Sequence, residues 1–570
     1  MRGRARRGRR RWPWAVVVVL VMAAAAGTAA GLWPRSGHAG ADPAAPQPVA
    51  RAFLRRWQAL DYAGMYALLT PAQRASLSFA AFRRSYRRDA AIAGVMAVRP
   101  SSRLEAFRGR VVATVAARLR RFGWVEQSIS LPVALAHGRF HVVWTAALAF
   151  PGLVPGERLA VRTLVPRGRG MIRAPGGVIL AQGPAEQRSY PQGSAFAVVT
   201  GYLRAPATRA ARARRVAAGW PAGRTYGQGG LERSLDQVLA GRPGFELLAI
   251  APSGRVDRVL ATRPGVAPHN VTTTLRPALQ LAATAALGNR YGGVVVLNPA
   301  TGAVLADAGL GMDVAQPPGS TFKMVTASAA LAGGRFSLSS TFPYAHYVVL
   351  NGWHLHNFHS EYCGGTLIEA FAVSCNTVFA PLADAIGGRA LVATATRYGF
   401  NQRPTVRYPA AESTTPPPSA LTSDLMAGEA GIGQGGVEAT ALQMAATAET
   451  IGNLGLQRPP HIVLRPAAAS DTQSPRRVVP VSVAAGVRSM MEAVVEYGTG
   501  TAAALPGVQV AGKTGTSDVG SGPSDAWFAA FVPAIRPRYV VAVLVVGGGV
   551  GGVTAAPIAR LVMEAALNGG

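Results

Sequence analysis

The sequence predicts a multidomain α+β protein, and three observations support this fold class. At 570 residues the chain is too long for one ordinary domain, and its 49% hydrophobic composition is sufficient for large cores. Residues 49–152 have the pattern of short amphipathic helices followed by alternating strands. Residues 265–570 have strand-like runs at both ends and apolar helical runs between them, which predicts one antiparallel sheet flanked by helices.

The N-terminus predicts a membrane anchor. Seven arginines lie within residues 1–11, and an uncharged apolar stretch with tryptophans near both ends follows at 12–33. As a helix this stretch would be about 33 Å long, enough to span a bilayer, and the positive-inside rule leaves the basic tail in the cytoplasm. The rest of the chain is then extracytoplasmic, joined to the anchor by a linker at 34–48. A cleaved signal peptide is the alternative, because 23–30 is rich in small residues.

The elements of the first half follow from hydrophobic periodicity. Helices are expected at 51–59, 62–69 and 79–86, and strands at 111–116, 128–133 and 140–145. This small α+β domain closes near residue 152. Residues 153–264 have short strands broken by glycine and proline, which is typical of a connecting or pedestal module. Within it, 205–216 combines four arginines with many alanines and predicts a charged, exposed helix.

The elements of the last 300 or so residues support a single sheet domain. A β-hairpin is expected from strands at 292–298 and 303–308, with further strands at 526–532 and 539–546 and a closing helix at 554–567. The proline-rich segments around 404–423 and 458–480 are expected to be surface insertions.

The net charge of +31 does not predict a nucleic-acid partner. The arginines are spread along the chain without a nucleic-acid motif, so a generally arginine-rich composition is the better explanation, and attraction to anionic membrane or envelope polymers is a modest addition. An oxidising compartment would permit a disulfide between Cys363 and Cys375, but their spacing does not establish one, and buried free thiols are the expectation. His354, His356 and His359 lie near Glu361 at a spacing that zinc could use, yet a metal-free loop is the simpler interpretation.

The distribution of lysine points to the chemistry. Only two of the 58 basic residues are lysines, in Ser320-Thr321-Phe322-Lys323 and Lys513-Thr514-Gly515-Thr516. Arginine cannot be deprotonated in a protein, whereas a lysine amine shifts its pKa readily and can act as a base. Both positions are therefore predicted to need an amine that moves protons or donates from a compact head.

The first lysine motif contains the two groups that an activated serine nucleophile requires, a hydroxyl and a nearby base. Residues 317–320 end a loop and 321–332 favour helix, so Ser320 and Lys323 lie three apart on one helix face near its N-terminus. The positive end of the helix dipole would push the amine toward its neutral, basic form, which could take the proton of the serine hydroxyl. A serine that merely caps the helix is the alternative.

Two further elements complete the candidate site. Ser374-Cys375-Asn376 opens another helical run and places a hydroxyl beside a carboxamide, a pair able to relay a proton and hold a peptide carbonyl. Lys513 begins a strand-like stretch to which a substrate peptide could add by backbone pairing, with Gly515 allowing close approach. Lys513, Thr514 and Thr516 could bind a substrate carboxylate, and the backbone N–H groups of Ser320 and Thr516 could form an oxyanion hole.

In this order, separated by 54 and 139 residues, the three motifs resemble those of class B, monofunctional penicillin-binding proteins. Other stretches also resemble this family: Gly230-Leu231-Glu232, Gly431-Ile432-Gly433-Gln434-Gly435, Ala441-Leu442-Gln443-Met444-Ala445 and Asp525-Ala526-Trp527-Phe528. Residues 49–152 resemble the NTF2-like domain of methicillin-resistance-type members. The resemblance implies an NTF2-like domain at 49–152, a dimerisation-type pedestal at 153–264 and a transpeptidase domain at 265–570.

The resemblance further implies a peptidoglycan D,D-transpeptidase that needs no cofactor and no metal. Ser320 would attack the penultimate D-Ala of a stem peptide, with Lys323 as base and Ser374 and Asn376 in the proton relay. Lys513 would bind the substrate carboxylate, and β-lactams would acylate Ser320. The membrane and a separate glycosyltransferase are the implied partners, because nothing in the chain resembles a glycosyltransferase domain.

Several alternatives remain open at this point. A D,D-carboxypeptidase differs only in passing the acyl group to water. A β-lactamase or penicillin sensor shares the motifs, although the glutamate signature of a class A β-lactamase is missing, and a non-catalytic assembly scaffold is the option from another class. The motifs do not distinguish elongation, division or sporulation, nor do they specify the acceptor amine or the affinity for β-lactams.

Overall fold

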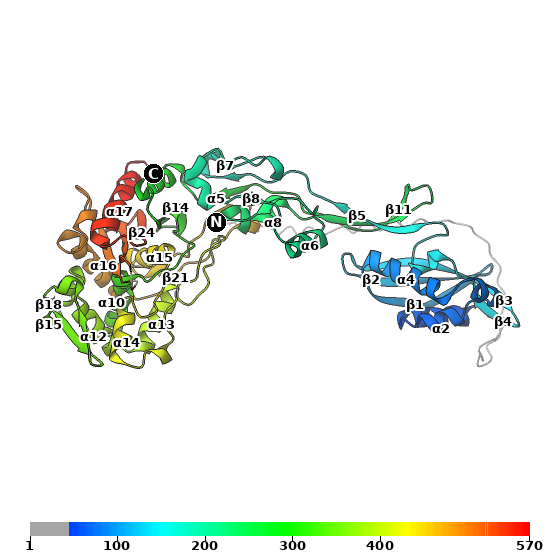
Figure 1. The fold of residues 1–570 in the computed structure, drawn as a ribbon, viewed down its shortest axis with the longest axis horizontal. Helices are drawn as coiled ribbons and strands as arrows, with labels where there is room; N and C mark the ends of the chain where they lie inside the picture. Colours follow the sequence, from blue (N-terminus) through cyan, green and yellow to red (C-terminus); the bar gives the residue numbers. More distant parts are fainter. Residues whose placement is uncertain (1–44, 519, 521, 570) are drawn as a thin grey trace, which may run out of the picture. The chain divides into compact units, whose positions relative to one another are not determined.

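The computed structural model describes residues 45–518, 520 and 522–569. The chain forms two compact units. The order of the helices and strands along the chain can be followed by colour in Figure 1. Of the described residues, the first unit comprises 45–83, Pro100–Thr114 and Ser128–Thr145, and the second comprises Arg84–Arg99, Val115–Gln127 and those from Ala146 onward. The predicted tail, anchor and most of the linker lie outside the described residues. Within the described part of the chain no single helix is long and apolar enough to cross a membrane, and only a bent helix pair, Asn376–Ile386 with Gly388–Tyr398, has the length and composition to do so.

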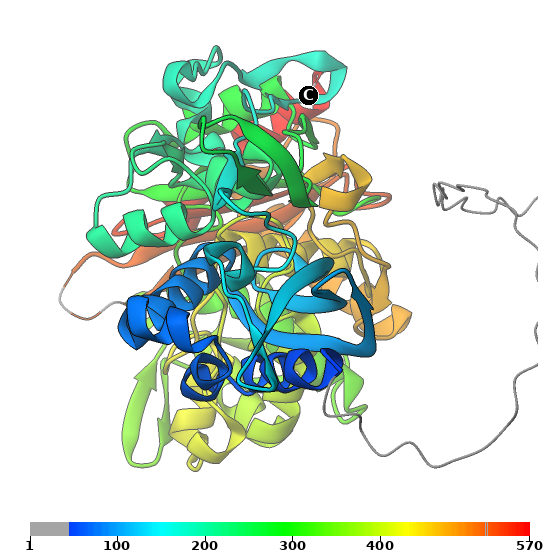
Figure 2. The ribbon, with the colours of Figure 1, turned by 90° about the vertical axis from the view of Figure 1, so that its right-hand side faces the viewer.

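The N-terminal segment has the expected order of helices followed by strands (Figure 2, blue). Its helices are α1 (Gln47–Gln58), α2 (Tyr62–Ala67), α3 (Pro71–Ser76) and α4 (Phe79–Ala93). Its strands, β1 (Val95–Phe107), β2 (Arg110–Leu119), β3 (Gly123–Ala136) and β4 (Arg139–Val142), form a sheet in that order. Asp61 and Thr70 cap α2 and α3 through their side-chain oxygens. The periodicity did not predict β1, because most of its side chains are exposed and several are charged.

The pedestal segment contributes strands to two small sheets, the second of which also contains two strands from later in the chain. The first has the order β11-β10-β5, from β5 (Arg158–Leu164), β10 (Gly244–Ile250) and β11 (Val256–Arg263). The second has the order β20-β12-β6-β7, from β6 (Ile172–Arg173), β7 (Ile179–Ala181), β12 (Val271–Thr273) and β20 (Val463–Arg465). Its short helices are α5 (Ala197–Thr200), α6 (Arg209–Ala217), α7 (Gly230–Ser234) and α8 (Asp236–Ala240), and β8 (Leu203–Arg204) pairs with β9 (Tyr226–Gly227). Helix α6 buries none of its residues, as its composition predicted.

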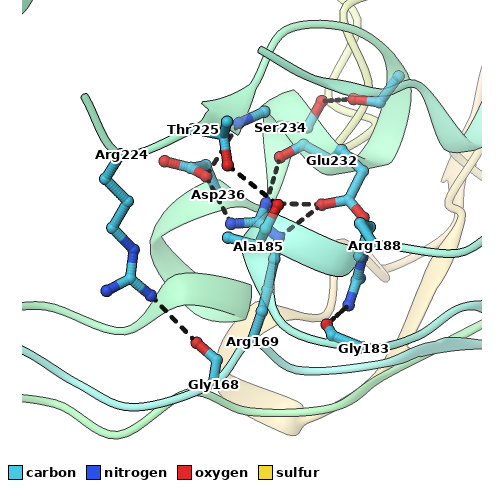
Figure 3. A network of polar contacts seen from close by, with 12 residues as sticks. Gly168, Arg169, Gly183, Ala185, Arg188, Arg224, Thr225, Glu232, Ser234 and Asp236 are labelled. Atoms are coloured by element: carbon cyan, nitrogen blue, oxygen red, sulfur yellow. Dashed lines mark hydrogen bonds and ion pairs between the residues drawn. The ribbon is translucent and has the colours of Figure 1, made fainter. Parts of the chain in front are cut away.

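A buried ion network holds the pedestal segment together (Figure 3). Glu232 is fully buried and accepts from Arg169 Nε at 2.8 Å and from Arg188 Nε at 2.6 Å. Asp236 accepts from Arg169 Nη1 at 2.8 Å and from Arg215 Nη1 at 3.2 Å. Because the side chain of Arg169 is only 1% exposed, removing either carboxylate would leave a buried charge with too few partners.

The C-terminal segment contains the predicted antiparallel sheet, in the order β14-β13-β24-β23-β22. Its strands are β13 (Gly292–Asn298), β14 (Ala303–Gly309), β22 (Ala511–Ser517), β23 (Asp525–Val532) and β24 (Tyr539–Val545). Side chains alternate between two cores: Trp527, Ala529 and Phe531 of β23 enter one, and Ala526, Phe528, Ala530 and Val532 enter the other. Helices α9 (Pro277–Leu287) and α17 (Gly551–Leu567) cover the second face, while α10 (Lys323–Ala332), α15 (Ala441–Gly452) and α16 (Val481–Glu496) cover the first.

The remaining elements surround the first core. The helices are α11 (Leu367–Ala372), α12 (Asn376–Ile386), α13 (Gly388–Tyr398) and α14 (Asp424–Gly431). The strands pair as β15 (Thr341–Ala345) with β18 (Cys363–Thr366), β16 (Tyr347–Leu350) with β17 (Trp353–His356), and β19 (Leu456–Gln457) with β21 (Arg476–Arg477).

The prediction that both proline-rich segments are surface insertions is wrong in part. In the second segment, strand β20 pairs with β12, and Asp471 is buried, accepting hydrogen bonds from the backbone N–H groups of Ile462 and Val463. In the first segment, Val406 and Tyr408 belong to the core. Proline marks irregular backbone, but these long-range contacts decide whether that backbone is buried.

Candidate active site

The three motifs meet in one pocket of about 460 Å³, although they are distant in the sequence. Its lining residues are drawn from all three: Ser320, Ser374, Asn376, Thr514 and Thr516. The lysines lie beneath this surface, since Lys323 and Lys513 are both 0% exposed. The arrangement therefore places hydroxyl groups at the opening of the pocket and amines behind them.

Ser320 lies in the short 3-10 turn η5 (Gly319–Phe322) that leads into α10. Gly319 has a φ of +50° and its N–H donates to Gly433 O at 3.0 Å, while Trp527 Nε1 donates to Pro317 O at 2.9 Å. Pro318 is the residue that precedes the turn, and the Ser320 hydroxyl makes no hydrogen bond among the described residues. The alternative in which Ser320 merely caps the helix therefore has no support in the geometry.

Lys323 is bound to the second motif. Its Nζ donates to Ser374 O at 2.7 Å and to Asn376 Oδ1 at 2.7 Å, and lies 3.4 Å from Ser374 Oγ. Burial, followed by the nearby charge of Lys513, lowers the pKa of Lys323 well below its ordinary value. The helix dipole, which the sequence suggested as the cause, is therefore not the main one. The two short contacts use both N–H bonds of a neutral amine and leave its lone pair free for a proton.

Ser374 lies between the two lysines in a backbone conformation that is unusual for serine. Its φ is +62°, and its Oγ accepts from Lys513 Nζ at 2.9 Å. A non-glycine residue in this region is strained by about 1 kcal/mol or more and persists only where its surroundings hold it. The neighbouring Cys375 provides such a restraint, since its N–H donates to Ala370 O at 2.8 Å.

Cys363 and Cys375 form a disulfide, so the prediction of free thiols is wrong. Their Cα atoms are 5.9 Å apart, because β18 runs beside the start of α12. The spacing of 12 residues could not reveal this proximity, which depends on the pairing of β18 with β15. The bond ties the second motif to a β-strand on the wall of the pocket.

The third motif forms β22, which lies at the edge of the sheet. Lys513 Nζ donates to Ser374 Oγ and, at 3.1 Å, to Thr514 O, and burial lowers the pKa of Lys513 to about 7. Strand β22 packs closely on the turn that holds Ser320, because a Cβ on Gly515 would lie 2.7 Å from Pro318 O. Among the described residues β22 has one strand neighbour, β23, so an extended peptide could add along its other edge.

The structure also identifies site residues that the sequence did not single out. Thr499 lines the pocket, and its Oγ1 lies 2.5 Å from Thr514 Oγ1. Asn357 is buried, accepts from Thr377 N at 2.9 Å, and fixes the first turn of α12. Gly433 belongs to a glycine-rich stretch that was recognised only by resemblance, and a Cβ there would meet Gly319 O. No local signal could have identified Thr499 or Asn357, since each acts through a long-range contact.

The histidine cluster lies next to this pocket without forming a metal centre. The ring of His354 stacks on Tyr347 with centroids 4.5 Å apart, and His359 lines the pocket. Within the described part of the chain, no group of three or more histidine, cysteine, aspartate or glutamate side chains is placed to hold a metal ion.

Comparison with known proteins agrees with this site. Residues 292–564 match the penicillin-binding protein transpeptidase domain, and residues 170–273 match the penicillin-binding protein dimerisation domain. The chain is 34% identical over 474 residues to the peptidoglycan D,D-transpeptidase PbpA of Mycolicibacterium smegmatis, which covers 71% of this chain and 90% of that protein. It is 32% identical over 478 residues to PbpA of Mycobacterium tuberculosis, covering 71% and 90%.

Solved structures of penicillin-binding proteins are also similar to this chain. The crystal structure of PBPA from M. tuberculosis has a TM-score of 0.55 and 31% identity, covering 70% of this chain and 99% of that one. A penicillin G acyl-enzyme complex of the same protein has a TM-score of 0.56 and 31% identity, covering 70% and 100%. With both domains matched and its three motifs assembled in one pocket, the chain belongs to the class B penicillin-binding protein transpeptidases.

Proposed function

We propose that this protein cross-links peptidoglycan through an acyl-enzyme on Ser320, as a D,D-transpeptidase. The observation that supports the proposal most strongly is the position of Ser374 Oγ, 2.9 Å from Lys513 Nζ and 3.4 Å from Lys323 Nζ. Both amines are buried and both have a lowered pKa, to about 7 for Lys513, so each loses its proton more readily than an ordinary lysine does. A scaffold without catalytic activity would gain nothing from two buried lysines, which are costly to bury.

The chemical steps follow from this arrangement. Neutral Lys323 takes the proton of Ser320 as its Oγ attacks the carbonyl carbon of the penultimate D-Ala. The N–H groups of Ser320 and Thr516 stabilise the oxyanion, a contribution typically worth about 10² to 10³ in rate per donor. The proton passes through Ser374 to the leaving D-Ala amine, and the peptide C–N bond breaks. An amine of a neighbouring stem peptide then attacks the acyl-enzyme, forming the cross-link and releasing Ser320.

The substrate binds along the free edge of β22. The extended D-Ala-D-Ala end pairs with the backbone of the strand, and its carboxylate reaches Lys513, Thr514 and Thr516. An arriving carboxylate raises the pKa of Lys513 from about 7, so the substrate itself completes the protonation of that amine. β-Lactams enter by the same route and acylate Ser320, in keeping with the imipenem and penicillin G acyl-enzymes of the M. tuberculosis relative.

The remaining parts of the chain adapt this chemistry to the cell envelope. Residues 12–33 anchor the protein in the membrane with 1–11 in the cytoplasm, and residues 49–152 form an NTF2-like domain like that of methicillin-resistance-type members. Residues 153–264 form the pedestal, residues 265–570 form the transpeptidase domain, and a separate glycosyltransferase supplies the glycan strands. The disulfide between Cys363 and Cys375 supports an extracytoplasmic catalytic domain, since such bonds persist in oxidising compartments.

Covalent labelling tests the assignment of the nucleophile. A fluorescent penicillin should label the wild type and the control variant Ser339→Ala, whose serine is exposed and outside the pocket. Ser320→Ala should abolish labelling without lowering the melting temperature. Mass spectrometry that places the adduct on another residue would disprove the assignment.

Product analysis separates the proposal from its alternatives. Supplied with lipid-linked peptidoglycan and a partner polymerase, the enzyme should form cross-linked dimers. Release of D-Ala without dimers would indicate a carboxypeptidase, and repeated turnover of nitrocefin would indicate a β-lactamase. A reporter that is active only outside the cytoplasm, fused after Gly570, should be active if the proposed topology is right.

A further inference from the structure

A second hollow, of about 840 Å³, lies in the larger unit and shares no lining residue with the active-site pocket. Its rim is rich in arginine, and we refer to it as the arginine hollow. Its arginines come from six separate places in the chain: Arg121, Arg215, Arg233, Arg242, Arg263 and Arg407. Short-range sequence patterns therefore could not have shown it.

The lining of the arginine hollow has six arginines and one carboxylate. The carboxylate is that of Asp236, which already accepts from Arg169 (Figure 3). Asp236 also accepts from Arg215 and from the backbone N–H of Gly227. The other five lining arginines form no ion pair among the described residues. Guanidinium groups cannot lose their charge, so the hollow keeps a strong positive potential at every physiological pH.

The floor of the hollow is aromatic, but its rings are already covered. Trp220 and Phe245 are only 7% and 4% exposed. The guanidinium of Arg215 lies 5.0 Å from the Trp220 ring, and that of Arg121 lies 4.8 Å from the Phe245 ring. Arg215 also has Nε and Nη2 buried without a hydrogen-bond partner. The hollow therefore presents guanidinium donors over its two most deeply buried aromatic rings.

We propose that the arginine hollow binds a phosphodiester-linked polyanion of the cell envelope. Phosphate matches the planar fork of arginine, which donates two parallel hydrogen bonds to its oxygens. Six cations distributed around a large hollow suit a ligand with several anionic groups along a flexible polyol chain, rather than one small ion. Bound there, the polymer would retain the enzyme in the cell wall without touching Ser320. The assignment of the polymer to the cell envelope rests on the proposed extracytoplasmic location of this domain. Binding of the polymer in solution does not depend on that location.

The test compares two triple variants of the full-length protein in detergent. One removes Arg242, Arg263 and Arg407 of the hollow, each by substitution with Ala. The control removes the same charge elsewhere, through three exposed arginines that form no ion pair within the described part of the chain: Arg335→Ala, Arg389→Ala and Arg397→Ala. The probes are a labelled poly(glycerol phosphate) oligomer, poly-L-glutamate of equal charge, and phosphatidylglycerol vesicles against phosphatidylcholine vesicles.

The wild type should bind poly(glycerol phosphate) more tightly than poly-L-glutamate, with an affinity that falls as salt rises. The hollow variant should lose about 10-fold or more in affinity, since three charge-assisted contacts disappear, while the control should change by about twofold or less. Penicillin acylation should be unchanged in both, which separates this proposal from the function of Ser320. An equal loss in both variants would show attraction by net charge alone. Tighter binding of poly-L-glutamate, or binding to anionic vesicles only, would also overturn the proposal in favour of an acidic protein or a lipid surface.

Discussion

Replacing Lys513 by methionine should make the folded protein more stable at neutral pH while abolishing its chemistry. Lys513 is 0% exposed, and burial lowers its pKa from 10.5 to about 7. In the unfolded chain the amine keeps its ordinary pKa, so between pH 7 and 10.5 the unfolded state binds more protons. Stability therefore rises with pH through this window, and the cost of burying the amine is greatest at or below pH 7.

The size of the effect follows from the pKa shift. A lysine with a pKa of about 7 in the folded state and 10.5 in the unfolded state destabilises the fold by about 4 kcal/mol at pH 7. By the same relation, the buried lysine destabilises the fold by about 2 kcal/mol at pH 9. Methionine fills a similar volume without a charge, but it removes the hydrogen bonds to Ser374 Oγ and Thr514 O, at about 1 kcal/mol each. The net gain should be about 2 kcal/mol at pH 7 and close to zero at pH 9.

Melting temperatures of the wild type and Lys513→Met at both pH values provide the measurement. For a domain of this size the gain corresponds to about 4 °C at pH 7, and it should nearly vanish at pH 9. The control is Arg397→Met, an exposed arginine on α13, which should show no such pH dependence. If the difference between Lys513→Met and the wild type were the same at both pH values, the amine would not be neutralised by burial, and the reasoning would fail.

Three further changes test other parts of the structure. Lys323→Arg should lose penicillin acylation nearly as completely as Lys323→Ala, by about 10² to 10⁴, because a guanidinium cannot accept a proton; an acylation rate within a few-fold of the wild type would refute base catalysis. Replacing Cys363 and Cys375 together by alanine should lower both the melting temperature and the acylation rate. A disulfide that closes a loop of this length typically stabilises a protein by about 3 kcal/mol, and this one also restrains the second motif. Unchanged acylation would show that the bond contributes to stability alone. Glu232→Gln should destabilise the protein by about 3 kcal/mol or more, because Arg169 loses a buried counter-charge, and a melting temperature equal to that of wild type would contradict the importance of the network.

The sequence by itself determined the candidate chemistry and the regular elements. The residue types at 320, 323, 374 and 513 indicate a serine nucleophile served by amines, because hydroxyl and amine reactivity belongs to the side chains themselves. The hairpin at 292–308 and the strands near 526 and 540 could be predicted because short, continuous apolar runs that are bounded by turn residues are a local signal of buried strands. Their approximate boundaries were therefore predictable, and the structure confirms them.

Only the tertiary structure decided which groups meet. Lys323 hydrogen-bonds to Ser374 and Asn376 rather than to Ser320, and its pKa falls chiefly through burial rather than through a helix dipole. The disulfide, the pairing of β20 with β12, and the arginine hollow likewise depend on segments far apart in the chain. Burial and pairing arise from long-range packing, in which each segment's environment is supplied by other segments. Local periodicity and composition therefore could not predict these contacts.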